Sequence, residues 1–254
     1  MNNKQTKRLI LVLTDKGGTG KSLFSRGVAD YLIRKQFSSS VLFVDGDGEV
    51  GQLLQFYKGA GVISAQIVDE QHRDQFLEIL ESNQPLIIVD LPAAAISNLA
   101  KLEAEINFFK VVIDHGYQLT LCNVMSPFKA SVRSVKAMIE LAGANADYVV
   151  VKNRFFGDDA DFHLYESGQG KKALAKHNGL EISMPKISTG VLAELDVKNI
   201  PFWQAVDDGQ LKLAYRCRVN QWLKEFDEQL HALNLTEHLQ QETINEPKSI
   251  SSVA

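Results

Sequence analysis

A glycine-rich turn with two lysines and a serine contains the residues best suited to chemistry. It reads Asp15-Lys16-Gly17-Gly18-Thr19-Gly20-Lys21-Ser22. Glycine has no Cβ, so the backbone N–H groups of such a turn can close around phosphate oxygens. In this pattern Lys21 reaches the outer phosphates, and the Ser22 hydroxyl is a ligand of Mg²⁺. We therefore predict a nucleotide site; the alternative is a plain turn whose lysines lie in solvent.

A strand and a helix are needed to position this turn. The apolar run 8–14 precedes it and is typical of a buried strand. Residues 23–35 follow it, with Phe24, Val28 and Leu32 at helical spacing. A helix that starts there points the positive end of its dipole at a bound phosphate.

Acidic residues follow two further apolar runs. Asp90 comes directly after Leu86–Val89, while Asp45 and Asp47 come after Val41–Val44. In an open parallel sheet, ligands bind beyond the carboxyl ends of the strands, so these acids should face the phosphates. Asp90 is then a candidate for holding Mg²⁺ through water. The alternatives are a helix cap for Asp90 and simple turn chemistry for Asp45 and Asp47.

Five short apolar runs alternate with helical patterns along the chain. Runs that are apolar on both faces indicate a parallel sheet covered on both sides, that is, a three-layer α/β fold with a mostly parallel sheet. Residues 63–68 fit either an edge strand or a loop, and residues 211–230 form an apolar stripe at helical spacing. We predict one domain over residues 1–235 and a polar, flexible tail over 236–254. The five runs are Leu9–Leu13, Val41–Val44, Leu86–Val89, Leu119–Val124 and Tyr148–Val151.

Composition excludes several classes of protein. A net charge of −4 disfavours coating of nucleic acid by bulk electrostatics. The cysteines, Cys122 and Cys217, are isolated, which argues against zinc and iron–sulfur sites and for a reducing compartment such as the cytoplasm. We expect no signal peptide and no membrane insertion, because the apolar runs are strand-sized and the tail lacks large apolar residues.

The lysine directly before Gly-Gly-x-Gly-Lys-Ser resembles the deviant Walker A motif of the ParA/MinD family of P-loop ATPases. The resemblance implies an ATP-dependent homodimer in which Lys16 reaches the ATP of the partner subunit. It also implies that Asp47 orients the attacking water and that Asp45 supports the Mg²⁺ shell. The loop departs from the family after Asp47, where Gly48-Glu49 replaces the usual Pro-Gln.

The resemblance continues weakly towards the C-terminus and implies an adenine site. Asn153 and Arg154 follow the fifth apolar run, where family members contact the base. An amide offers both a donor and an acceptor to a purine edge, although Asn153 could equally cap a turn. The segment 182–186 resembles the loop in which a proline, here Pro185, packs on the base.

The leading interpretation is a slow ATPase switch that regulates binding to DNA or to a protein partner, as in plasmid partition or conjugal transfer. One alternative is a metabolic P-loop enzyme, such as an ATP-dependent carboxylate-activating ligase or a small-molecule kinase. Another is a nucleotide-dependent scaffold that scarcely hydrolyses ATP. Two basic sets could bind DNA, although solvated helix faces explain them better: Lys129, Arg133 and Lys136, and Lys212 with Arg216.

Overall fold

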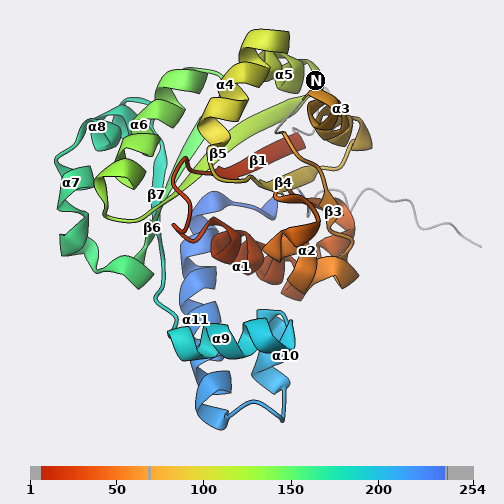
Figure 1. Cartoon of the computed structure of the whole chain (residues 1–254), viewed down its shortest axis with the longest axis vertical. Coiled ribbons are helices and arrows are strands. Elements are labelled where there is room, and N and C mark those ends of the chain that lie inside the picture. The colour runs from red at the N-terminus through yellow and green to blue at the C-terminus, as the bar shows by residue number, and fades with distance from the viewer. Residues whose placement is uncertain (1–6, 68–69, 238, 240–254) are drawn as a thin grey trace, which may run out of the picture.

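A seven-stranded parallel sheet forms the centre of the molecule (Figure 1). This computed structural model describes residues 7–67, 70–237 and 239. The strand order is β3-β2-β4-β1-β5-β6-β7, and every neighbouring pair is parallel. The predicted three-layer parallel architecture is therefore confirmed. The strands are β1 Lys7–Leu13, β2 Val41–Asp45, β3 Ile63–Ser64, β4 Leu86–Asp90, β5 Tyr117–Met125, β6 Asp147–Asn153 and β7 Leu180–Met184.

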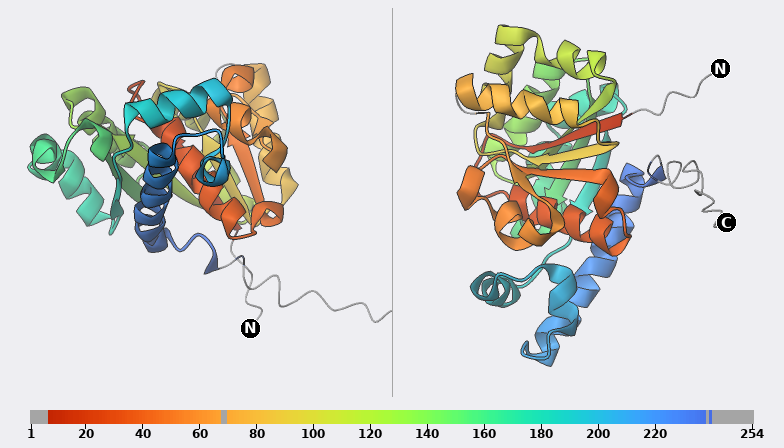
Figure 2. Two further views of the ribbon diagram at one scale, coloured as in Figure 1. Left: turned by 90° about the horizontal axis from the view of Figure 1, so that it is seen from below. Right: turned by 90° about the vertical axis from the view of Figure 1, so that its right-hand side faces the viewer.

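Helices cover both faces of the sheet and enclose two apolar cores (Figure 2). Alternate residues of β1 point into opposite cores: Ile10 and Val12 enter one, and Leu9 and Leu11 enter the other. The first core is closed by α1 Lys21–Arg34, α2 Gln52–Tyr57, α9 Thr189–Lys198, α10 Phe202–Asp207 and α11 Leu213–Leu230. The second is closed by α3 Glu70–Glu78, α4 Ala95–Ile106, α5 Phe108–Asp114, α6 Lys129–Ala142, α7 His163–Glu166 and α8 Gln169–Lys176.

The five predicted runs are strands, but the sheet has two more among the described residues. Residues 63–64 form the short edge strand β3. Residues 182–184, which the family pattern placed in a base-side loop, belong to strand β7, so that prediction is wrong. This strand lies at the sheet edge and alternates Ile182 and Met184, which are buried, with the half-exposed Glu181 and Ser183. Such alternation gives no continuous apolar run.

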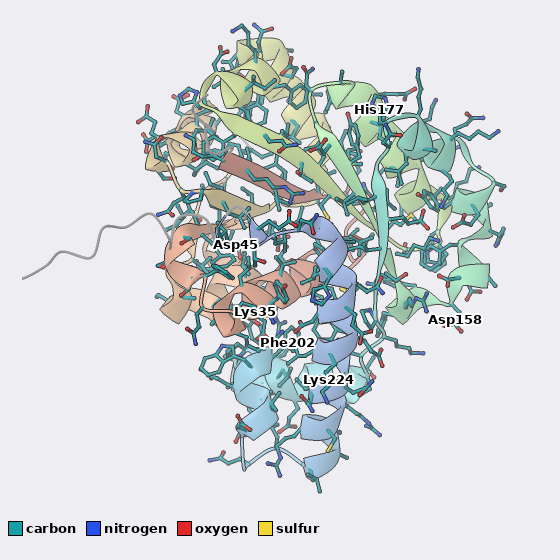
Figure 3. The ribbon with its side chains drawn as sticks, turned by 180° about the vertical axis from the view of Figure 1, so that it is seen from behind. Lys35, Asp45, Asp158, His177, Phe202 and Lys224 are labelled. Carbon is teal, nitrogen blue, oxygen red and sulfur yellow. The ribbon has the colours of Figure 1, made fainter. Side chains whose placement is uncertain are left out.

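Helix α11 crosses the first core and packs on α1 where that helix has no side chain. A Cβ added to Gly27 would lie 2.5 Å from the Phe226 ring, so glycine permits the close approach. Phe226 stacks on Trp222, with ring centroids 4.8 Å apart, and meets Phe24 edge-on. Phe202 of α10, labelled in Figure 3, also packs on Trp222, with ring centroids 4.8 Å apart. The predicted C-terminal stripe therefore packs on the core.

Most of the predicted tail, residues 236–254, lies outside the described residues, so its predicted flexibility stays a prediction. Within the described part of the chain, no helix is both long enough and apolar enough to cross a membrane.

We predict that Phe226→Ala lowers the free energy of unfolding by about 3–5 kcal/mol, because it leaves a cavity between α1 and α11. Phe226 is fully buried, whereas Leu213 of the same helix is 67% exposed. Leu213→Ala is the control and should change stability by less than about 0.5 kcal/mol. Urea unfolding of both variants measures the difference, and similar losses in the two would contradict this account of the packing.

Candidate nucleotide-binding site

The predicted phosphate loop links the end of β1 to the start of α1 at the carboxyl edge of the sheet. Gly18 and Gly20 have φ values of 75° and 97°, a region that glycine enters at little cost. A Cβ at Gly20 would lie 2.3 Å from Asn153 Nδ2, so a side chain has no room there. Gly20 supplies no side-chain cap to α1, and the first turn of α1 has no acidic residue. The N–H groups of this turn are thus available to an anion.

The two lysines of the loop lie in different surroundings. Lys21 begins α1 and is 7% exposed, so its side chain is confined within the site. Lys16 is exposed at the rim of the loop. Thr19 is buried, and its hydroxyl has no hydrogen-bond partner among the described residues. A buried polar atom of this kind needs a ligand or water for satisfaction.

Two carboxylates stand in register on neighbouring strands. Asp45 at the end of β2 pairs with Asp90 at the end of β4, and Asp90 also pairs with Val12 of β1. Both acids are essentially inaccessible to solvent. Parallel pairing therefore brings together acids that lie 45 positions apart in the sequence.

Asp90 is buried, and its charge is only partly compensated by its surroundings. Neither of its carboxylate oxygens has a hydrogen-bond partner by distance and angle among the described residues. Its pKa is raised to about 7, chiefly by burial and also by the charge of Asp45, although Lys21 and the hydroxyls of Ser22 and Ser25 lower it. An unpartnered carboxylate beside a serine hydroxyl fits the oxygen ligands that Mg²⁺ prefers. The residues at this point therefore suit a metal ion carried by a nucleotide.

Asp45 differs from Asp90 because backbone N–H groups of the following loop and of α2 donate hydrogen bonds to its carboxylate. Its Oδ1 accepts a hydrogen bond from the Asp47 N–H at 3.0 Å, and its Oδ2 accepts one from the Leu54 N–H at 2.9 Å. Burial nevertheless raises its pKa. A Cβ at Gly51 would lie about 2 Å from the carboxylate oxygens, so this loop closes tightly around it. In this geometry Asp45 shapes the loop that carries the exposed Asp47.

Asn153 braces the phosphate loop. Its Nδ2 donates to the Thr19 carbonyl at 2.8 Å, and its Oδ1 accepts from the Phe155 N–H at 3.0 Å. The amide that the family pattern assigns to adenine is thus already engaged at both ends. The turn-capping alternative describes its contact with Phe155, and the contact with Thr19 was not predicted.

Arg154 and Pro185, the other predicted base contacts, line one hollow of about 350 Å³ at the ends of β6 and β7. Arg154 forms an ion pair with Asp159 at 2.7 Å. The Pro185 carbonyl accepts a hydrogen bond from Trp222 Nε1, which fixes this loop to α11. The same hollow is bordered by Asp158, Ser183, Lys186, Glu225, Glu228 and Gln229.

Three residues of the site were not predicted. Thr14 accepts a long hydrogen bond from the Lys16 N–H and contacts Ser134 of α6. Asp15 accepts a hydrogen bond from the N–H of Ile96 in α4. The sequence signal for Asp15 was that it replaces the glycine at the first position of the general phosphate-loop pattern. No sequence signal pointed to Thr14 or Ser134.

No family model matches the chain. Protein MobD of Acidithiobacillus ferrooxidans is 23% identical over 221 residues, which cover 86% of this chain and 94% of MobD. Protein TraL of Escherichia coli is 26% identical over 158 residues, which cover 59% of this chain and 64% of TraL, slightly less than two thirds of its length.

Among solved structures, the MinD cell division protein of Aquifex aeolicus is similar with a TM-score of 0.51. It is 15% identical in sequence, and the match covers 89% of this chain and 97% of MinD. At this low sequence identity, the structural similarity establishes the fold alone. The chain therefore has the fold of MinD and, before its first helix, the deviant phosphate-loop sequence through which it resembles the ParA/MinD ATPases.

Proposed function

We propose that the protein is a ParA/MinD-like ATPase switch, which dimerises on MgATP and hydrolyses it slowly. The observation that carries this proposal is the unpartnered, buried Asp90 beside Ser22 and Lys21. A buried carboxylate without compensation is costly, and a metal ion at this position removes that cost. The uncapped start of α1 supports a phosphate group at the same point.

Each residue of the site has a proposed role. The backbone of residues 17–20 and Lys21 would hold the phosphates, and Ser22 with Asp90 would hold Mg²⁺. The metal would neutralise phosphate charge, and phosphoryl transfer depends mostly on such neutralisation and on positioning. The exposed Asp47 would orient the attacking water. Asp45 would act by fixing the Asp47 backbone, since its oxygens accept hydrogen bonds from the N–H groups of Asp47 and of Leu54 in α2.

The output of the switch is also proposed. The deviant lysine supports regulated binding to DNA or to a protein partner, as in plasmid partition or conjugal transfer. A cytoplasmic location stays a prediction; the two cysteines, Cys122 and Cys217, are free thiols in the structure, which agrees with a reducing compartment. Measuring ATP turnover with and without DNA separates the switch from a scaffold that does not hydrolyse ATP.

We predict that Lys21→Ala weakens ATP binding by about 100-fold or more, because it removes a charge-assisted contact to the phosphates. Lys35→Ala is the control: Lys35 lies just beyond the other end of α1 and is exposed. Isothermal calorimetry measures both affinities. Equal ATP binding by the Lys21 variant and the wild type would refute the site assignment.

We predict that Lys16→Ala binds ATP within about threefold of the wild type but does not form the ATP-dependent dimer. The side chain is exposed at the rim, where it is free to reach a second copy. Sedimentation velocity with MgATP measures the dimer. A normal ATP-bound dimer would show that Lys16 acts only within its own subunit.

The buried Asp90 makes stability depend on pH. An unfolded aspartate ionises near its ordinary pKa of 3.8, whereas folded Asp90 holds its proton up to about pH 7. Between these values the folded protein binds more protons than the unfolded chain, so stability falls as pH rises and stays lower above pH 7. We predict that Asp90→Asn removes this fall in stability between pH 3.8 and pH 7.

Urea unfolding at pH 5, 6 and 8, without nucleotide or magnesium, measures this effect. Relative to the wild type, Asp90→Asn should gain stability with rising pH, by a few kcal/mol in all. Comparing the free energies of unfolding of both proteins at each pH cancels the contributions of the other titrating groups. MgATP should then stabilise the wild type more than the variant. A difference that does not change with pH would show that Asp90 is ionised throughout.

A further inference from the structure

Asp15 occupies the first position of the phosphate loop, where the general pattern has glycine. We infer that Asp15 is a positioning residue that joins the phosphate loop to the first turn of α4. It thereby couples the backbone at Lys16 to the segment that follows Asp90. This inference deepens the proposed function, and its kinetic tests rest on that function.

The contacts of Asp15 with α4 are made by both its side chain and its backbone. Its Oδ1 accepts a hydrogen bond from the Ile96 N–H at 3.0 Å, and its carbonyl accepts one from the Ala94 N–H at 3.3 Å. Ala94 is the N-cap residue of α4 and has no side-chain acceptor of its own. Asp15 therefore supplies from the phosphate loop the cap that α4 lacks.

Ala94 has a backbone conformation that needs external support. Its φ of 59° and ψ of 25° lie in the left-handed region, which is unfavourable for alanine. Such a conformation persists when surrounding contacts hold it. Asp15 accepts hydrogen bonds from the N–H of Ala94 itself and from the N–H of Ile96, so the bend between β4 and α4 depends on the phosphate loop.

The position of Asp15 at the N-terminus of α4 explains how an acid can lie next to a phosphate site. The N-termini of α1 and α4 both open at this edge of the sheet, and both attract anions. The Asp15 carboxylate occupies the N-terminus of α4. The uncapped N-terminus of α1 is then left for phosphate.

The segment between Asp90 and α4 lies beside the end of β1 and the first residues of the phosphate loop. The Leu91 N–H donates to the Val12 carbonyl at 3.0 Å, at the end of β1. Gly17 lies close to the same segment, because a Cβ added there would be 3.9 Å from the Ala93 Cβ. Lys16 therefore lies between Asp15, which is hydrogen-bonded to the start of α4, and Gly17, which is close to Ala93. A shift of either element should be passed to the other.

The alternative is that Asp15 merely stabilises the start of α4. Ser97 provides a matched control, because its hydroxyl donates to the Ala94 carbonyl at 2.8 Å in the same turn. Ser97→Ala removes a hydrogen bond from this turn and leaves the contacts of the phosphate loop intact. Asp15→Asn keeps an oxygen acceptor, whereas Asp15→Ala and Asp15→Gly remove it; the glycine also restores the general motif.

The first experiment is hydrogen exchange of the amides of residues 94–98 in the nucleotide-free, full-length protein. Exchange should rise by about tenfold in Asp15→Ala and Asp15→Gly, and Asp15→Asn should stay within about threefold of the wild type. Unchanged exchange in the alanine variant would overturn the inference. This measurement needs no nucleotide, so it tests whether Asp15 holds the start of α4 even if the protein proves not to bind ATP.

The second experiment separates ATP affinity from turnover in the same proteins. Asp15→Ala and Asp15→Gly should lower kcat by about tenfold while the Kd for MgATP stays within about threefold. Asp15→Asn should restore most of the turnover, and Ser97→Ala should leave it unchanged. Wild-type turnover in Asp15→Gly, or an equal loss in Ser97→Ala, would refute a positioning role.

Discussion

The structure of the site depends on one unfavourable arrangement, the buried carboxylate of Asp90 in register with Asp45. The two acids end neighbouring parallel strands, so the sheet itself holds like charges together. Asp45 is compensated by the N–H groups of Asp47 and of Leu54 in α2, whereas Asp90 has no hydrogen-bond partner by distance and angle among the described residues. The free energy of the folded protein is lowered when a cation or a proton binds to Asp90. Nucleotide-borne Mg²⁺ fits that requirement and would bring the phosphates to α1.

Around this point, loops that follow different strands are tied to one another. The Gly46 N–H donates to the Asp90 carbonyl, which joins the loop after β2 to the end of β4. Asn153 joins the end of β6 to the phosphate loop through the Thr19 carbonyl. Asp15 joins that loop to α4. Hydrogen bonds therefore connect the phosphate loop to the end of β6 and to α4, and connect the loop after β2 to the end of β4.

Helix α1 extends this connection into the first core. Its buried Asp30 accepts hydrogen bonds from Tyr57 of α2 and from the Trp203 N–H of α10. Its buried Arg26 stacks on Phe56 of α2, 3.4 Å from the ring centroid. The helix that begins at the phosphate loop thus contacts α2, which follows the Asp47 loop, and α10. These polar contacts lie in the apolar core and specify one arrangement of the three helices.

The sequence by itself determined the phosphate loop, the five buried strands and the order of the acids, because these signals are local. Glycine spacing, apolar runs and the residue after each strand are readable without a partner. Tertiary structure alone decided which side chains are free and which are engaged. Asn153 and Asp45 are residue types that could contact a base or a metal ion, yet the side chain of each is hydrogen-bonded to a backbone group that folding brings near. The edge strand β7 and the capping of α4 by Asp15 likewise depend on neighbours distant in sequence, since strand pairing and helix caps are satisfied in space.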